Sequence, residues 1–138
     1  QVVQGTTTTA TTINTATYTD TTLTATITPT LATSKVLVMV TQNHYIAISG
    51  NYTAAGFKIF RDATSIFATP DSATFAQIQV IGASTVGLGN YSTVNYLDSP
   101  ATTSAVTYKT QLASGNPGTL FAQDTGAMST ITLIEVAA

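Results

Sequence analysis

The sequence predicts an all-β fold, an antiparallel β-sandwich or jelly roll of about 8–10 strands with no substantial helix. Three observations lead to this prediction. Apolar and polar residues alternate with period two in several segments, clusters of Gly and Pro recur at spacings of about 8–15 residues, and no window carries an apolar helical stripe. The 138 residues suffice for one domain with a buried core.

Threonine dominates the start of the chain, filling 31 positions in all and 15 of the first 30. Leu23, Ala25 and Ile27 alternate with threonines, whose β-branched side chains favour extended backbone while the hydroxyl keeps one face wet. We therefore expect residues 1–30 to form a Thr-rich strand region or arm joined to the same domain, and residues 31–138 to form the jelly-roll body. A disordered stalk is the alternative, although such linkers usually carry more Pro, Ser, Gly or charge.

The later strands follow from apolar runs and turn residues. After Pro29, the unbroken apolar run Val36–Val40 is typical of a strand covered on both faces. Further segments with strand character are 45–48, 56–60, 65–67, 91–97, 104–113 and 130–136. Breaks rich in Gly, Pro, Asp or Ser fall at 49–51, 61–63, 70–72, 98–100 and 115–118. The break at 61–63 predicts a hairpin, whereas the pattern within 75–89 does not fix the strand boundaries.

The composition excludes several classes of function. Charged residues make up 7% of the chain, against roughly 25% in ordinary soluble domains. With four Lys/Arg, six Asp/Glu and a net charge of −2, there is no basic patch for nucleic acid. The chain has no cysteine for a disulfide, and its longest apolar run is far too short for membrane insertion. Because the sequence starts with Gln1, we expect a processed product or a piece of a longer chain.

Catalytic and cofactor signatures are missing from the sequence. His44 is the one histidine, and no Gly-x-Ser-x-Gly motif surrounds a serine, so we interpret His44 as a strand residue at a sheet rim rather than as a catalytic base. We therefore predict that the chain is not an enzyme, with no catalytic residue, no cofactor and no metal. Single aspartates beside turn residues are expected to bond the turn backbone; they are Asp62, Asp71, Asp98 and Asp124.

Two further features allow an interpretation by position. Glu135 is expected on the same side of its strand as Ile131 and Leu133, where it would pair with a lysine or with a neighbouring subunit. The three glycines Gly82, Gly87 and Gly89 lack the Lys-Ser/Thr of a phosphate-binding loop, so we interpret them as loop glycines.

Four residues are candidates for surface contacts. Asn51-Tyr52-Thr53 and Asn90-Tyr91-Ser92 both match the N-glycosylation sequon, and both place a tyrosine in an expected exposed loop. Tyr and Asn together are typical of adaptable binding surfaces. The alternative interpretation is that each tyrosine covers the edge of the core. Asn51, Tyr52, Asn90 and Tyr91 are thus the predicted contact residues.

Several segments resemble a recurrent β-rich module of virion structural proteins in tailed bacteriophages. The residues that carry this resemblance are Gln1–Gln4, Thr22–Pro29, Ser34–Val38, Asp98–Pro100, Thr102–Lys109 and Ser129–Val136. The resemblance implies a jelly roll of the tumour-necrosis-factor type at the C-terminal end of a tail fibre or similar virion protein. It also implies assembly as a homotrimer without enzymatic activity. Residues 43–89 depart most from the pattern, so no binding residue is carried over.

The main hypothesis is therefore a structural and adhesion module of a tailed-phage virion. Its expected partners are itself, other virion proteins and a glycan or receptor on the host surface. A protein that decorates and stabilises the capsid is the first alternative, in which the Thr-rich start would be an arm ordered by its neighbours. A carbohydrate-binding, lectin-like domain is the second, with exposed tyrosines stacking on sugars.

Overall fold

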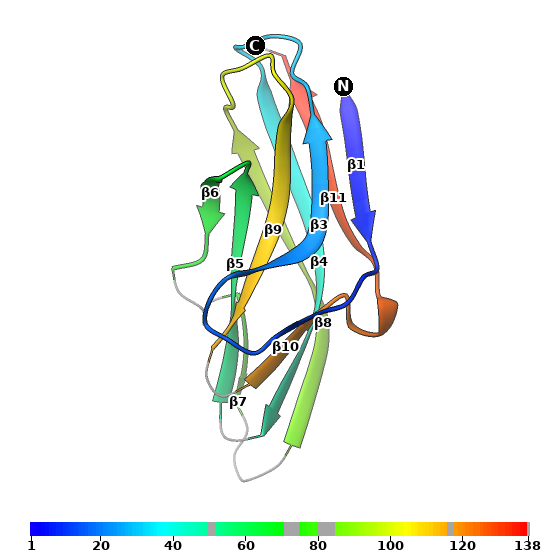
Figure 1. Ribbon diagram of the computed structural model, residues 1–138, viewed down its shortest axis with the longest axis vertical. Helices are drawn as coiled ribbons and strands as arrows, with labels where there is room; N and C mark the ends of the chain where they lie inside the picture. Colours follow the sequence, from blue (N-terminus) through cyan, green and yellow to red (C-terminus); the bar gives the residue numbers. More distant parts are fainter. Residues whose placement is uncertain (50–51, 71–74, 80–84, 116–117, 138) are drawn as a thin grey trace.

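The computed structural model describes residues 1–49, 52–70, 75–79, 85–115 and 118–137 (Figure 1). Its regular structure is almost entirely β, as predicted. The strands are β1 (Val2–Thr7), β2 (Thr11–Ile13), β3 (Thr19–Ile27), β4 (Lys35–Ser49), β5 (Tyr52–Arg61), β6 (Thr64–Ala68), β7 (Ala76–Gln79), β8 (Thr85–Asp98), β9 (Val106–Ser114), β10 (Gly118–Ala122) and β11 (Ser129–Val136). One 3₁₀ turn, η1 (Asp124–Gly126), separates β10 from β11.

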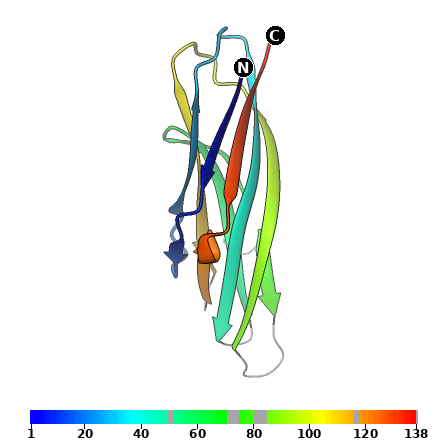
Figure 2. The same ribbon diagram turned by 90° about the vertical axis from the view of Figure 1, so that its right-hand side faces the viewer.

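Two antiparallel sheets form a sandwich. In sheet A, β4 pairs with β8 on one side and with β11 and β10 in succession on the other, and β1 and β2 pair in turn with β11 and β10. In sheet B the order is β3, β9, β5, and β5 then pairs with both β6 and β7. Figure 2 shows β1, β11, β4 and β8 side by side, with both chain ends at the same end of the molecule.

The topology is that of a jelly roll. Three of the sheet positions are each occupied by two short strands in line, namely β1 with β2, β10 with β11, and β6 with β7. When each of these pairs is taken as one strand, sheet A runs first, eighth, third and sixth in chain order, and sheet B runs second, seventh, fourth and fifth. This interleaving of two four-stranded sheets is the jelly-roll arrangement. The predicted fold class is therefore confirmed.

The apolar core lies between the sheets and follows from the period-two alternation. In β3 the buried apolar positions are Leu23, Ala25 and Ile27, which the sequence pattern predicted, and the threonines between them are exposed. The largest fully buried side chains are Tyr108, Phe57, Ile13, Leu23, Ile27, Ile46, Ile48, Ile59, Leu112, Leu120, Ile131 and Leu133. Their burial is the main force that holds the sheets together.

A buried polar layer crosses the core at the level of Gln42. Thr110 Oγ1 donates to Gln42 Oε1 at 3.0 Å, and Gln42 Nε2 donates to Ser129 Oγ at 3.1 Å. Thr21 of β3 also hydrogen-bonds Thr110 through the two hydroxyls. These residues come from both sheets, and each would be left unsatisfied by a slip in register. The layer therefore favours one alignment of sheet A on sheet B.

Other elements confirm or correct the sequence predictions. The hairpin is confirmed, since β5 and β6 pair around a turn in which Asp62 has a φ of 50°. The prediction that Val36–Val40 is covered on both faces is wrong for the single chain, because Met39 on the outer face is 39% exposed. Gly87 and Gly89 are strand residues of β8 rather than loop glycines, and Gly82 lies outside the described residues.

Candidate interaction surface

The outward-facing side of sheet A is built from every second residue of its strands, and we call it the sheet A face. Its first row crosses four strands through direct partners: Val2 pairs with Ile134, Ile134 with Leu37, and Leu37 with Leu97. Val2 and Leu97 are 66% and 48% exposed. Residues from opposite ends of the chain thus form one apolar row on the surface.

The next two rows are dominated by hydroxyl and amide groups. One contains Met39 between Thr132 and Asn95, with Gln4 beyond Thr132, whose hydroxyl accepts a hydrogen bond from Gln4 Nε2 at 3.0 Å. The other is a ladder of four threonines in register across the four strands, namely Thr6, Thr130, Thr41 and Thr93. β-Branched side chains pack well on such a pleated surface, so the side chains of these rows form a regular array.

An aromatic group occupies the far end of the sheet A face. Tyr45 lies across the neighbouring strand β8, where a Cβ added to Gly87 would overlap with the Tyr45 hydroxyl. Phe121 lies on the other side, with its ring 6.0 Å from that of Tyr45. Tyr91, opposite Asn43, is 52% exposed. Gly87 is therefore required by a tyrosine that covers the strand, which the local sequence pattern could not reveal.

Charge is nearly absent from the sheet A face. Among its described positions only Lys35, at the end of β4, is charged. The outer face of sheet B is different: Lys109 Nζ lies 2.9 Å from Asp20 Oδ2, and Lys58 Nζ lies 4.0 Å from the centre of the Tyr18 ring. Among the described residues, the outer face of sheet B thus carries Asp20, Lys58 and Lys109, whereas the sheet A face carries Lys35 alone.

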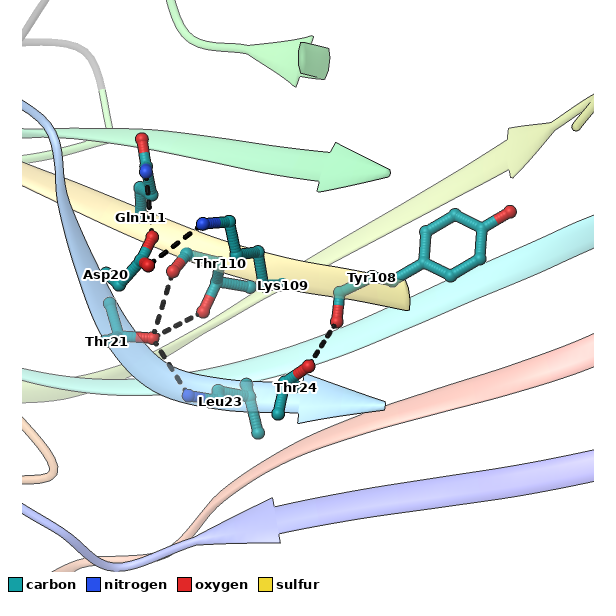
Figure 3. A network of polar contacts seen from close by, with 8 residues as sticks. All are labelled: Asp20, Thr21, Leu23, Thr24, Tyr108, Lys109, Thr110 and Gln111. Atoms are coloured by element: carbon teal, nitrogen blue, oxygen red, sulfur yellow. Dashed lines mark hydrogen bonds and ion pairs between the residues drawn. The ribbon is translucent and has the colours of Figure 1, made fainter. Parts of the chain in front are cut away.

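A shallow hollow lies on the sheet B side, where the register of β3 shifts between Asp20 and Thr24. Figure 3 shows the polar contacts of Asp20, Lys109 and Gln111 at this place. The hollow measures about 210 Å³ and is lined by Asp20, Thr22, Leu23, Thr24, Lys109 and Thr110. Burial alone would raise the pKa of Asp20, but hydrogen bonds from Lys109 and Gln111 outweigh it and lower the pKa. The volume is below the roughly 300 Å³ typical of ligand pockets, and the carboxylate is already engaged. We therefore interpret the hollow as a consequence of the bulge.

The strongest ionic contact joins the two sheets and has a structural role. Arg61 of β5 donates to both carboxylate oxygens of Asp98 at 3.0 and 2.8 Å, and the Tyr108 hydroxyl donates to the same carboxylate at 2.8 Å. Burial and the bond to Asp98 both raise the pKa of Tyr108. Asp98 is thus more than the turn residue that the sequence suggested.

His44 lies in the core and not at a sheet rim, so that prediction is wrong. It is 1% exposed, its ring lies 5.4 Å from that of Phe75, and its Nδ1 has no hydrogen-bond partner. Burial lowers its pKa, with a weaker opposing effect from the Gln42 backbone. In the described part of the chain, no group of three His, Cys, Asp or Glu residues could hold a metal ion.

Of the other predicted acids, Asp62 and Glu135 have defined partners for their carboxylates, and Asp71 lies outside the described residues. Asp62 accepts from the Thr107 backbone at 2.9 Å, and Asp124 begins the 3₁₀ turn. Glu135 was expected to pair with a lysine or a neighbouring subunit. Instead it accepts hydrogen bonds from the Thr30 backbone and hydroxyl at 2.6 and 2.7 Å, and these lower its pKa to about 2.

The structure does not bring the described contact residues Tyr52, Asn90 and Tyr91 together on one surface. Tyr52 begins β5 and points outward from sheet B, whereas Tyr91 lies on the sheet A face, so the two tyrosines occupy opposite sides of the sandwich. Asn90 and Tyr91 lie within β8 and not in a loop, and Asn90 Oδ1 accepts from the Tyr91 backbone at 2.8 Å. Asn51 lies outside the described residues. Of the three described contact residues, only Tyr91 belongs to the sheet A face.

Comparisons with known proteins give no family assignment. No family model matches the chain, and no curated protein matches it. Among solved structures, a protein of the infectious bursal disease virus Gt strain is 14% identical, with a TM-score of 0.46 over all of this chain and 38% of that one. Chains of the T13 particle and of T=1 particles of the same virus both give TM-scores of 0.43, at 14% and 13% identity.

The chain spans less than two fifths of the length of these viral proteins. The fold assignment rests on the strand pairing described above. Among the described residues, no helix is long and apolar enough to cross a membrane.

Proposed function

We propose that this chain is a non-enzymatic structural module of a virus particle that assembles through the sheet A face. The observation that carries the proposal is the unequal distribution of charge between the two sheets. A surface of apolar, hydroxyl and amide groups costs less to remove from water than a charged surface, because few ions have to lose their hydration.

The exposure of β4 supports the same surface. Met39 is exposed although it belongs to an apolar run typical of a strand covered on both faces. The chain itself covers only the inner side, so a neighbouring subunit would supply the outer cover. A low net charge further favours association over a soluble monomer.

The finer form of the proposal is a fibre or other appendage of a tailed bacteriophage, with the chain as a homotrimer. It is supported by the resemblance to tailed-phage virion modules at the segments named above. Three copies that bury one uncharged face each around a common axis would form a closed assembly with the charged sheet B outside. The proposal places the protein in the virion.

A carbohydrate-binding role is the second candidate, because Tyr91 is half exposed beside amide and hydroxyl groups. Loss of binding on a glycan array after Tyr91→Ala, with no loss after Tyr52→Ala on the opposite side, would favour it. Equal signals from both variants and the wild type would count against it.

The virion proposal is tested by quantifying this protein in purified particles by mass spectrometry, against the major capsid protein. A few copies per particle would support an appendage. Copies in proportion to the capsid subunits would support the decoration alternative, and absence from washed particles would contradict a virion role.

A further inference from the structure

The edges of the sandwich differ in how they are protected. Unpaired backbone groups on an edge strand recruit other strands, so proteins shorten, cover, bend or charge their edges. On one side of this sandwich, β1 and β3 cover each other: a Cβ on Gly5 would overlap with the Thr24 carbonyl, and the Thr7 and Thr22 hydroxyls lie 2.9 Å apart. On the other side, the edge of sheet B consists of β6 and β7, with five and four residues.

Among the described residues, the fourth edge, β8, lacks these protections. It has 14 residues, and among the described strands it pairs with β4 alone, in unbroken register from Val36–Asp98 to Ser49–Thr85. Figure 2 shows it along the outer border of sheet A. It contains no proline, and its only charged residue is Asp98 at its end. Because antiparallel pairing uses alternate backbone groups, about half of its amides point away from β4.

We propose that β8 pairs with β8 of a second copy of this chain, so that two A sheets join into one continuous sheet. In this antiparallel pairing, β8 of one copy lies opposite β8 of the other. No like charges would meet along 85–97, because these residues contain no charged side chain. Valines, threonines and tyrosines, which favour cross-strand pairs, fill much of the strand.

The proposed pairing fits the surface described above. A two-fold axis perpendicular to the sheet reverses the strand direction while both sheet A faces stay on the same side. The joined sheet would therefore carry one uncharged face of doubled width. The inference extends the proposed function, but the contact uses the edge of β8 and not the face, so the two can be tested separately.

Amide hydrogen exchange on the purified chain tests the inference. We expect alternate β8 amides to exchange at least about tenfold more slowly at high than at low protein concentration. Leu88→Lys adds a charge at an inner-side position that is 47% exposed, outside the sheet A face, and should abolish this protection. Met39→Lys, on the face, should retain it.

Exchange of β8 amides that is fast at every concentration would overturn the inference. So would protection that persists in Leu88→Lys or disappears in Met39→Lys. None of these results decides whether the sheet A face assembles. That question is tested separately by the mass of the purified chain in solution.

Discussion

Tyr45 of β4 lies across Gly87 of β8, so closely that a Cβ on Gly87 would overlap with the tyrosine hydroxyl. The Tyr45 ring thus occupies the space that a side chain at residue 87 would fill. In this way a residue of β4 covers part of the neighbouring strand β8. This contact explains why a strand that forms the border of the sheet contains glycine, which otherwise weakens a strand.

Gly87→Ala should therefore destabilise the fold by about 1–3 kcal/mol, because Tyr45 must leave its position. Gly89→Ala is the matched control, since its Cβ would lie 3.5 Å from Tyr45 Cδ2, an ordinary contact. Denaturant unfolding of both variants measures the difference. An equal effect of the two substitutions on the free energy of unfolding would show that the position of the Tyr45 ring does not require glycine at residue 87.

Asp98→Asn should cost about 2 kcal/mol of unfolding free energy, because it leaves the Arg61 charge without its partner and weakens the bond to Tyr108. The side chains of Arg61 and Asp98 are 22% and 8% exposed. Asp20→Asn breaks the more exposed pair with Lys109 and should cost less than about 1 kcal/mol. Thermal or denaturant unfolding would contradict this ranking if Asp20→Asn were the more damaging change.

Acid should destabilise the chain through His44. Burial lowers the pKa of folded His44 below 6.5, so the unfolded chain binds the proton more readily. The contribution of neutral His44 to the free energy of unfolding is therefore complete above about pH 6.5. It is lost as the pH drops toward the pKa of His44 in the folded chain. The contribution of Glu135 is lost in a lower window, between its ordinary 4.5 and about 2.

We expect the unfolding free energy of the wild type to decrease from about pH 7.5 to about pH 5, and that of His44→Leu to change much less. Urea titrations at a series of pH values provide the measurement. Parallel pH profiles for the two proteins would rule out His44 as the source.

The sequence pattern predicted the strands that bury one side regularly, such as β3, because period two is a local property. It expected a strand region or arm over residues 1–30 without placing β1 and β2 as separate strands, and it did not place β10. These short strands owe their place to pairing with distant strands. It also placed Gly87 in a loop, since the tyrosine that covers it belongs to another strand.

The candidate surface could not be predicted for the same reason. Val2, Leu37, Leu97 and Ile134 become one row only through the register of four strands. The low charge of the chain was evident from its composition, but the near absence of charged residues from the sheet A face was not. The sequence analysis placed His44 at a sheet rim. At a polar residue, the alternation pattern does not show whether the side chain points into the core or toward solvent.

The central claim is that the sheet A face is buried between subunits, and the mass of the purified chain in solution tests it most directly. Light scattering after size-exclusion chromatography at about 10 μM should show an assembly for the wild type and for Thr26→Lys, a control on sheet B. Met39→Lys should weaken association through the sheet A face at least about tenfold and lower the mass of the assembly toward that of the dimer joined through β8, while the chain remains folded. A wild type that is monomeric, or a Met39→Lys variant that assembles as the wild type does, would contradict the claim.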